Sequence, residues 1–449
     1  MRNSNSDNLG SASIPSLLIK LSLPAVLGML ANALYNIIDT IFIGQGVGSL
    51  GIAAVAISLP IQMIILAISC LIGIGAGSMT SRSLGSKDME QVNYIAGNSF
   101  SSLFFVGILL SVFGFIFSGS IVRLFGATDK IFSYANDYAK ILFIASFYYP
   151  LCIAGNNLLR AEGNAKDAMN LMLVGIIVNV FLDYVFIFKL NMGIKGAAWA
   201  TVIGEFCSFI YLISYLRSSR TNIRIHFKFF KPVVKVLKEM LAIGFSAFSL
   251  QSASAIVGVV LNHSLGFYGG EIAIAVCGVV YKFMLFLFMP LVGLKQGMQP
   301  ILGYNYGARQ FSRVKEVLKL SIGISFIMAF VVVVLAEIFP VFTLRIFSND
   351  SNLIYLGIPA LRTVILFMPF IGIHICSIGF FQSIGRPIEA FVVALLRQIL
   401  LFLPLITILP KIFPDPLMGI WLSFPISDFF AVAISGSIFL YNIRKIERL

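Results

Sequence analysis

Apolar runs of about twenty residues recur along the whole chain, as in "FVGILLSVFGFIFSGSIV" (105–122) and "IGISFIMAFVVVVLAEIF" (322–339). A helix of roughly 20 apolar residues spans the bilayer core, whereas membrane barrel strands have about ten residues of alternating character. Only 11% of the residues are charged and 59% are hydrophobic, while soluble proteins carry about a quarter charged residues. The sequence therefore predicts an all-α integral membrane protein.

The apolar runs predict twelve transmembrane helices in a multi-pass chain. They lie near residues 15–43, 50–81, 94–119, 133–158, 168–188, 194–216, 239–264, 273–305, 316–342, 353–380, 387–410 and 417–441. The polar start "MRNSNSDNLGSASIPS" has no cleavable-signal pattern, so we expect the first span to remain and to act as the targeting signal.

Basic residues are distributed unevenly between the two sides of the membrane. With both termini on one side, that side holds 21 Lys and Arg residues and the other holds seven. Since cytoplasmic loops carry the excess of Lys and Arg, both termini are predicted to be cytoplasmic. The net charge of +13 thus follows from membrane topology and from contact with anionic lipids, not from binding nucleic acid.

The two halves of the chain repeat one another. Four pairs of similar segments occur in the same order at offsets of 220 to 223 residues: 71–92 with 291–314, 122–130 with 344–352, 160–165 with 382–387, and 196–206 with 419–429. Six spans in each half is an even number, so the halves would be parallel repeats related by a pseudo-two-fold axis along the membrane normal. This architecture is typical of secondary transporters, with the substrate path between two six-helix lobes.

The repeat also predicts the domain boundaries. We expect an N-lobe at residues 1–216, a basic cytoplasmic linker at 217–238, and a C-lobe at 239–449.

The halves disagree at four polar positions within the spans. Asp39, Asn179, Asp183 and Thr201 correspond to Val259, Leu401, Leu405 and Phe424. Two carboxylates, an amide oxygen and a hydroxyl suit a small hard cation such as Na⁺. They suit protons equally, because two neighbouring buried carboxylates cannot both ionise cheaply. Ionisable residues within spans are functional by default, and the alternative is that these groups only join helices by hydrogen bonds.

Pro24 precedes Asp39 by fifteen residues on the first span. Proline removes a backbone hydrogen bond and allows a kink. Pro24 is therefore a candidate hinge through which protonation of Asp39 changes the shape of the helix, although a static kink fits the sequence equally well.

Other ionisable and polar residues are candidates for a substrate cavity. Glu205 corresponds to Asp428 in the repeat, and Lys282 and Arg397 could pair with these carboxylates or contact substrate. Gln296 and Met298 flank Gly297 on the eighth span and are also candidate cavity residues. No nucleophile–base pair, metal-ligand spacing or cofactor motif occurs, so an enzyme is not expected, and no cofactor is expected beyond the coupling ion.

The chain resembles the multidrug and toxic compound extrusion (MATE) family over essentially its whole length. The resemblance lies in "LPAVLGMLANALYNIIDTIFIG" (23–44), "GNNLLRAEGNAKDAM" (155–169), "NVFLDYVFIF" (179–188), "GAAWATVIGE" (196–205) and "GLKQGMQPILGYNYGAR" (293–309). It implies a monomeric antiporter of the bacterial or archaeal inner membrane, which exports amphipathic, often cationic drugs against inward Na⁺ or H⁺. Two six-helix lobes would alternate between inward-open and outward-open V shapes.

The resemblance also implies roles for single residues. Asp39, Asn179, Asp183 and Thr201 match the cation site of the family, with Tyr138 on the fourth span as a further member, and Pro24 matches the proline at which the first helix bends. Members similar to NorM also use carboxylates in spans 7 and 10, which have none here. This departure favours the DinF-like branch, which includes MepA-like pumps, and leaves Na⁺ and H⁺ as alternatives.

Two other functions remain as alternatives. A lipid-linked oligosaccharide flippase of the same superfamily would have a cationic cavity, to which Lys282, Lys295 and Arg397 could contribute. A channel-like membrane protein would move its ligand without coupling to an ion.

Overall fold

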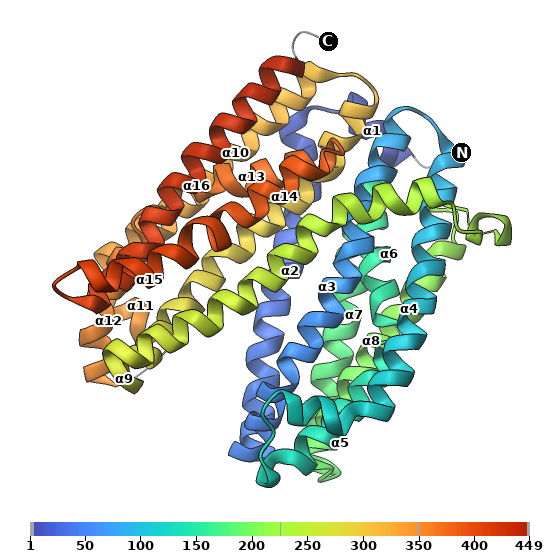
Figure 1. Ribbon diagram of the computed structural model, residues 1–449. Helices are drawn as coiled ribbons and strands as arrows, with labels where there is room; N and C mark the ends of the chain where they lie inside the picture. Colours follow the sequence, from blue (N-terminus) through green and yellow to red (C-terminus); the bar gives the residue numbers. More distant parts are fainter. Residues whose placement is uncertain (1–3, 225, 348–349, 447–449) are drawn as a thin grey trace.

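The computed structural model describes residues 4–224, 226–347 and 350–446, and the regular structure within these ranges is helical throughout (Figure 1). The first bundle comprises α2 (Ile14–Gly46), α3 (Ser49–Gly85), α4 (Met89–Leu124), α5 (Asp129–Ala145), α6 (Tyr149–Ala161), α7 (Ala165–Asp183), the π-helical η1 (Tyr184–Lys189) and α8 (Gly193–Arg217).

The second bundle follows a linker that contains the short 3₁₀ helix η2 (Phe227–Phe230). It comprises α9 (Val234–Gly307), α10 (Phe311–Ile338), α11 (Pro340–Arg345), α12 (Ser351–Ile365), η3 (Met368–Phe370), α13 (Ile371–Ser383), α14 (Pro387–Leu395), the π-helical η4 (Leu396–Phe402), α15 (Leu403–Ile412) and α16 (Pro416–Ile446). The predicted linker, 217–238, therefore ends inside a helix, because α9 already begins at Val234.

The described part of the chain contains ten helices that are long and apolar enough to cross a membrane, and α5 with α6 forms an eleventh crossing bent by 48°. One of the ten, α9, is 74 residues long and is interrupted at Gly270, where the backbone has φ 64° and ψ −160°. Glycine adopts this conformation because it has no Cβ. Counted as two crossings, α9 brings the total to twelve, and the predicted twelve-helix architecture is confirmed.

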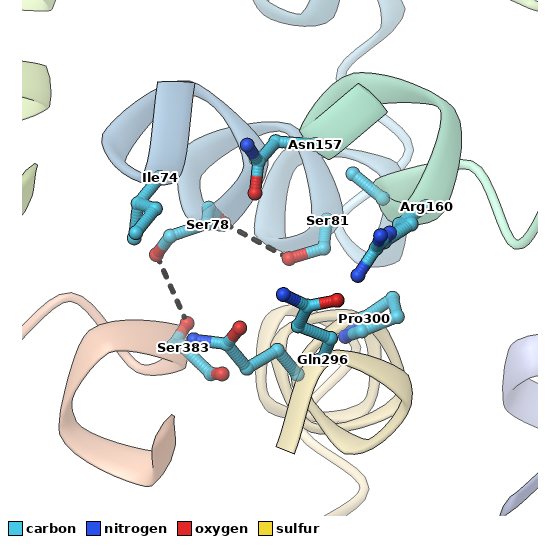
Figure 2. Close-up of a pocket in the computed structure, with 11 residues that line it drawn as sticks. Ile74, Ser78, Ser81, Asn157, Arg160, Gln296, Pro300 and Ser383 are labelled. Atoms are coloured by element: carbon cyan, nitrogen blue, oxygen red, sulfur yellow. Dashed lines mark hydrogen bonds between the residues drawn. The ribbon is translucent and has the colours of Figure 1, made fainter. Parts of the chain in front are cut away.

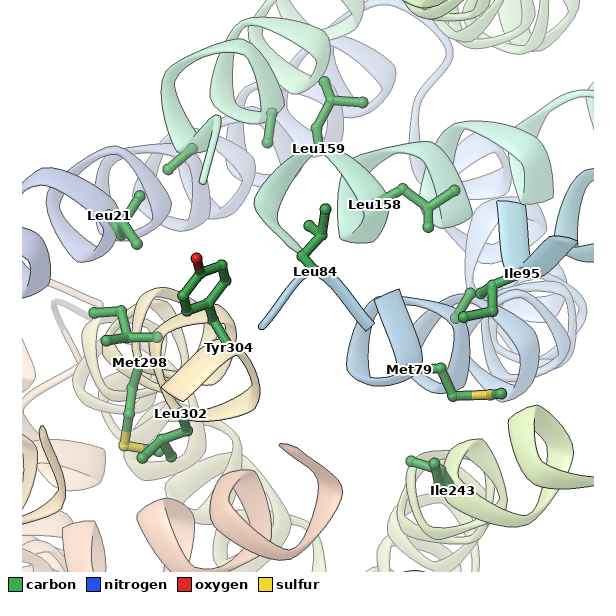
Figure 3. Close-up of a cluster of buried hydrophobic side chains, with 14 of the residues drawn as sticks. Leu21, Met79, Leu84, Ile95, Leu158, Leu159, Ile243, Met298, Leu302 and Tyr304 are labelled. Atoms are coloured by element: carbon green, nitrogen blue, oxygen red, sulfur yellow. The ribbon is translucent and has the colours of Figure 1, made fainter. Parts of the chain in front are cut away.

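The two bundles meet at one end of the molecule and diverge toward the other (Figure 1). The short helix α1 (Ser4–Ser11) and the C-terminal end of α16 lie where the bundles meet, and we call this the terminal end. A single hydrophobic core joins the bundles there: Leu21, Met79 and Leu158 of the first bundle share it with Ile243 and Met298 of the second (Figure 3). Burial of this shared core holds the terminal end closed.

Glycines allow helices of the two bundles to touch through their backbones. A methyl group added at Gly75 of α3 would overlap the carbonyl oxygen of Met240 in α9. One added at Gly293 of α9 would lie 2.7 Å from Cα of Val26 in α2. Small residues permit this close approach between membrane helices, so the contact between the bundles is a tightly packed seam.

The outer surface is apolar, as a lipid-facing surface must be. On α4, Phe105, Phe113, Ile116 and Phe117 are each more than half exposed, with exposed fractions of 52–65%. Soluble monomers rarely carry such a continuous apolar surface, so α4 presents this face to lipid.

The linker between the bundles is bound to the terminal end of the first bundle. Glu162, directly after α6, accepts hydrogen bonds from the backbone N–H groups of Asn222 (2.6 Å) and Ile223 (3.2 Å) and from the Thr221 hydroxyl (2.8 Å). The Glu162 side chain is only 1% exposed. Burial raises the pKa of this carboxyl to about 7, although these hydrogen bonds oppose the increase.

Candidate functional site

Three helices of the first bundle bring the four predicted cation ligands together. Asp39 lies on α2, Asn179 and Asp183 lie on α7, and Thr201 lies on α8. Asn179 and Asp183 are one helical turn apart and share a face. The Asn179 side-chain amide donates a hydrogen bond of 3.1 Å to the Thr201 hydroxyl, which donates in turn to the carbonyl of Ala197 at 3.1 Å.

The acceptor oxygens of this cluster are buried and lack donors. Asp39, Asn179 and Asp183 are 8%, 3% and 0% exposed. Oδ1 of Asp39, Oδ1 of Asn179 and both carboxylate oxygens of Asp183 have no hydrogen-bond partner among the described residues. Buried acceptors without donors are costly, and a bound proton or cation would remove this cost.

The carboxyl groups of Asp39 and Asp183 are direct neighbours. Two carboxylates in contact within a low-dielectric interior repel strongly unless a proton or a cation lies between them. Together with the Asn179 amide oxygen, they form an all-oxygen ligand set of the kind that hard cations prefer. The arrangement can therefore exchange a proton or hold a small cation.

A π-helical turn, η1, begins directly after Asp183. Such turns interrupt the regular hydrogen-bond ladder of a helix and frequently occur at functional sites. No feature of the sequence around Asp183 predicted this turn.

Three aromatic or polar side chains extend the cluster. Tyr138 of α5, which the family resemblance suggested, is 2% exposed and lies beside Asp39, Asp183 and Gln62 of α3. Tyr35 lies near Asp39 and Thr201. Neither Tyr35 nor Gln62 was predicted as a site residue from the sequence, although Tyr35 precedes Asp39 by four residues and so shares its helix face.

Pro24 lies inside α2, between the two residues that contact α9 at the seam. A methyl group at Gly293 would clash with Val26, and one at Gly297 would overlap Ser22. The helix continues without interruption from Ile14 to Gly46. The proline thus lies within the part of α2 that is held at the seam, fifteen residues before Asp39 on the same helix.

The repeat-related carboxylates differ in their partners. Asp428 is fully buried, and one of its carboxylate oxygens lies 2.5 Å from Nε of Arg397. Glu205 has no ion-pair partner among the described residues. Lys282 is exposed on α9, so neither Glu205 nor Asp428 is paired with it.

The two candidates beside Gly297 have different surroundings. Met298 is fully buried in the hydrophobic core that joins the bundles. This placement corrects the expectation that Met298 faces a cavity, because the packing of α9 against α13 covers its side chain. Gln296 lines a small cavity at the seam, together with residues of α3, α6 and α13 (Figure 2).

Among the described residues, no group of three or more His, Cys, Asp or Glu side chains could hold a metal ion. The Asp39–Asp183 pair falls below this number, and its ligand set would depend on the neighbouring amide oxygen.

A comparison with protein families decides the membership of the chain. The family model described as MatE matches residues 24–185 and 242–408, two segments that correspond to the two halves of the repeat. The chain belongs to the MatE family. The predicted resemblance is thereby confirmed.

Known MatE relatives cover nearly the whole chain. The multidrug export protein MepA of Staphylococcus haemolyticus is 28% identical over 90% of this chain and 88% of its own length. MepA of Staphylococcus aureus is 27% identical over 94% of this chain and 92% of its own. An outward-facing multidrug resistance MATE family transporter of the MOP superfamily shares 25% of its sequence with this chain over the full length of both, with a TM-score of 0.94. This MatE protein is therefore MepA-like and has the two-lobe MATE fold.

Proposed function

We propose that this MatE protein is a secondary active exporter of amphipathic, often cationic drugs, driven by inward movement of H⁺ or Na⁺. The observation that carries the proposal is the buried pair of neighbouring carboxyl groups, Asp39 and Asp183, in which Oδ1 of Asp39 and both oxygens of Asp183 lack donors among the described residues. No such pair is needed for the shared fold, since the second half of the repeat has Val259 and Leu405 at these positions. The names of the MepA relatives supply drugs as the exported class, and the amphipathic, often cationic character of these drugs is what the family resemblance implies.

In the proposed mechanism, a cation or proton bound between Asp39 and Asp183 cancels their repulsion and favours one shape of α2. Pro24 lets the two parts of α2 change their relative angle. The shift between inward-open and outward-open states can be no larger than the difference in cation affinity between those states. The Tyr138 hydroxyl and the Asn179 and Thr201 side chains would complete the cation site.

The proposed orientation follows from the distribution of Lys and Arg. With the terminal end in the cytoplasm of a bacterial or archaeal cell, the closed seam faces inward and the bundles open outward. The protein would act as a monomer in the inner membrane, without a cofactor and without nucleic acid.

The flippase alternative is weakened by the surroundings of the basic residues. Arg397 is already neutralised by Asp428 at 2.5 Å, and Lys282 is exposed on α9. Arg397 therefore offers a pyrophosphate less positive charge than the sequence implies. An uncoupled channel would leave the carboxyl pair without a role.

The decisive experiment measures drug efflux from proteoliposomes in which Na⁺ and pH gradients are imposed separately. Asp39→Asn and Asp183→Asn should each abolish gradient-driven efflux, because neither variant keeps two carboxyl groups at the site. Asp137→Asn is the matched control, since it removes a carboxylate of the same bundle that pairs with Lys195 at 3.2 Å near the surface. Unchanged gradient-driven efflux in both site variants would refute the proposal.

A further inference from the structure

A small polar cavity lies within the seam between the bundles. Its volume is about 30 Å³, and its lining comes from α3 and α6 of the first bundle and from α9 and α13 of the second. Figure 2 shows the labelled side chains of α3 and α6 facing those of α9 and α13 across this space. About 10–15 Å³ on this measure is enough for one water molecule, so the cavity has room for one or two species of that size.

The cavity contains one cation and no anion. Arg160 of α6 lines it and is 7% exposed. None of the eleven lining residues is acidic. Within the described chain, Arg160 forms no ion pair, and the only acceptor of its guanidinium is the sulfur of Met172 at 3.7 Å. A buried guanidinium without an anion is strongly unfavourable.

The second half of the repeat shows that the fold does not require a cation at this position. Gln382 corresponds to Arg160 at the offset of 222 residues. Its side chain accepts a hydrogen bond from Gln299 at 2.9 Å and donates one to Ser246 at 3.0 Å. A neutral residue is therefore fully satisfied at the equivalent place, while Arg160 is not.

Further donors point to the same space. Asn157 and Gln299 line the cavity, and each uses one N–H on a protein oxygen, Asn157 at 2.8 Å and Gln299 at 2.9 Å. Each amide group has two N–H donors, so one remains for a ligand. The Gln296 side chain also lines the cavity, and its buried oxygen has no partner among the described residues. Rotation of this amide would direct its NH₂ group inward.

We propose that the cavity binds a small monovalent inorganic anion, such as chloride, between the Arg160 guanidinium and the amide N–H groups of Asn157 and Gln299. A single guanidinium matches the charge of a monovalent anion, whereas phosphate would bring more negative charge than this lining compensates. A halide is comparable in size to the water molecule that would otherwise fill the space, and its charge compensates that of Arg160.

The site would depend on conformation, because its lining comes from both bundles. Separation of the seam would remove Gln299 from Arg160 and expose the guanidinium to water, which abolishes the need for an anion. A ligand that binds one state better shifts the equilibrium toward that state. The anion would therefore stabilise the state in which the terminal end is closed. This inference is independent of the proposed drug and coupling ion.

The test compares the thermal unfolding of the purified protein in sodium chloride, sodium bromide and sodium gluconate at equal ionic strength. We expect chloride and bromide to raise the midpoint of the wild type by about 1–3 °C over gluconate. Arg160→Gln introduces the residue found at the corresponding position of the second half, Gln382, and should abolish the difference between the midpoints in halide and in gluconate. Arg217→Gln, at the exposed end of α8, should retain it. An equal halide effect in wild type and Arg160→Gln, or no effect in wild type, would overturn the proposal.

A second measurement does not depend on a folded variant. Crystals of the wild type grown in bromide should give an anomalous-scattering peak beside the Arg160 guanidinium. A cavity without such a peak at saturating bromide would contradict the assignment even if Arg160→Gln cannot be purified.

Discussion

Arg397 and Asp428 form a buried ion pair in the second bundle, with Nε of the arginine 2.5 Å from a carboxylate oxygen. Glu205 occupies the repeat-related position in the first bundle and has no such partner among the described residues. The same fold position therefore serves stability in one half and leaves an unpaired carboxyl group in the other. Asp39 and Asp183, which also lack ion-pair partners among the described residues, lie in the same first bundle as Glu205.

Loss of one member of this pair should strongly destabilise the protein. Arg397→Gln leaves the charge of Asp428, which is 0% exposed, without compensation, and breaking a buried pair in this way costs about 3–5 kcal/mol. The expected result is a marked fall in the midpoint of thermal unfolding. Arg362→Gln is the control, because its pair with Glu337 is 51% and 36% exposed and such pairs contribute about 0–1 kcal/mol. Equal effects of both substitutions would contradict the prediction.

Thr201 should act by orienting the Asn179 amide. Because Asn179 Nδ2 donates to the Thr201 hydroxyl at 3.1 Å, its oxygen is left free for the cation. Thr201→Val removes a hydrogen bond with a net contribution of about 1 kcal/mol, which is roughly fivefold in affinity. We expect the concentration of the driving ion at half-maximal efflux to rise by this factor. Thr201→Ser keeps the hydroxyl and should return this concentration to the wild-type value. An equal increase in Thr201→Val and Thr201→Ser would show that the hydroxyl is not responsible.

A larger residue at Gly297 should open the seam. A methyl group there would lie 2.5 Å from Cα of Ser22, and overpacking of this kind costs about 1–3 kcal/mol, or roughly 5- to 150-fold in a conformational equilibrium. Gly297→Val should therefore lengthen the distance between spin labels at positions 217 and 316 in a background without native cysteines.

Gly278→Val provides the control for this change on the same helix. No atom lies within 4 Å of a methyl group added at Gly278, so the label distance should remain that of the parent protein. An unchanged label distance in Gly297→Val would contradict the prediction, because it would mean that α2 and α9 adjust to the larger side chain without separating.

Glu162 should make the stability of the linker contact depend on pH. Burial raises its pKa from the ordinary value of 4.5 to about 7, so the folded protein binds the proton more tightly than the unfolded chain. Its contribution to stability is therefore greatest below pH 4.5 and declines as the pH rises through about 7. The unfolding midpoint of the wild type should fall over this range.

Glu162→Gln should flatten that dependence. The amide oxygen can accept both backbone N–H groups, which already share Oε1 of the glutamate, and the NH₂ group can donate to Thr221. Glu316→Gln, at an exposed position of α10, should leave the pH profile unchanged. A profile of Glu162→Gln that matches the wild type would assign the pH dependence to other groups.

Only part of the predicted cation site and its surroundings could be recognised from the sequence. Asp39, Asn179, Asp183 and Thr201 were recognisable because polar residues within membrane spans are expensive and because the other half of the repeat lacks them. Tyr35 and Gln62 were not included, since aromatic and amide side chains are common on any membrane helix. Only the packing of α2 against α7 and α8, and of α3 against α5, identified them as neighbours of the carboxyl groups.

The apolar run lengths and the internal repeat by themselves determined the membrane location, the twelve helices and the two six-helix halves. Each of these properties depends on the composition and order of contiguous segments, which the sequence shows directly. The tertiary structure alone decided which side chains share an environment. Met298 lies in the core, Arg397 pairs with Asp428, and Glu205 has no ion-pair partner among the described residues. Arg160 lines a cavity that has no acidic residue in its lining. These outcomes depend on how helices distant in sequence pack at the seam, and the period of a single helix contains no information about that packing.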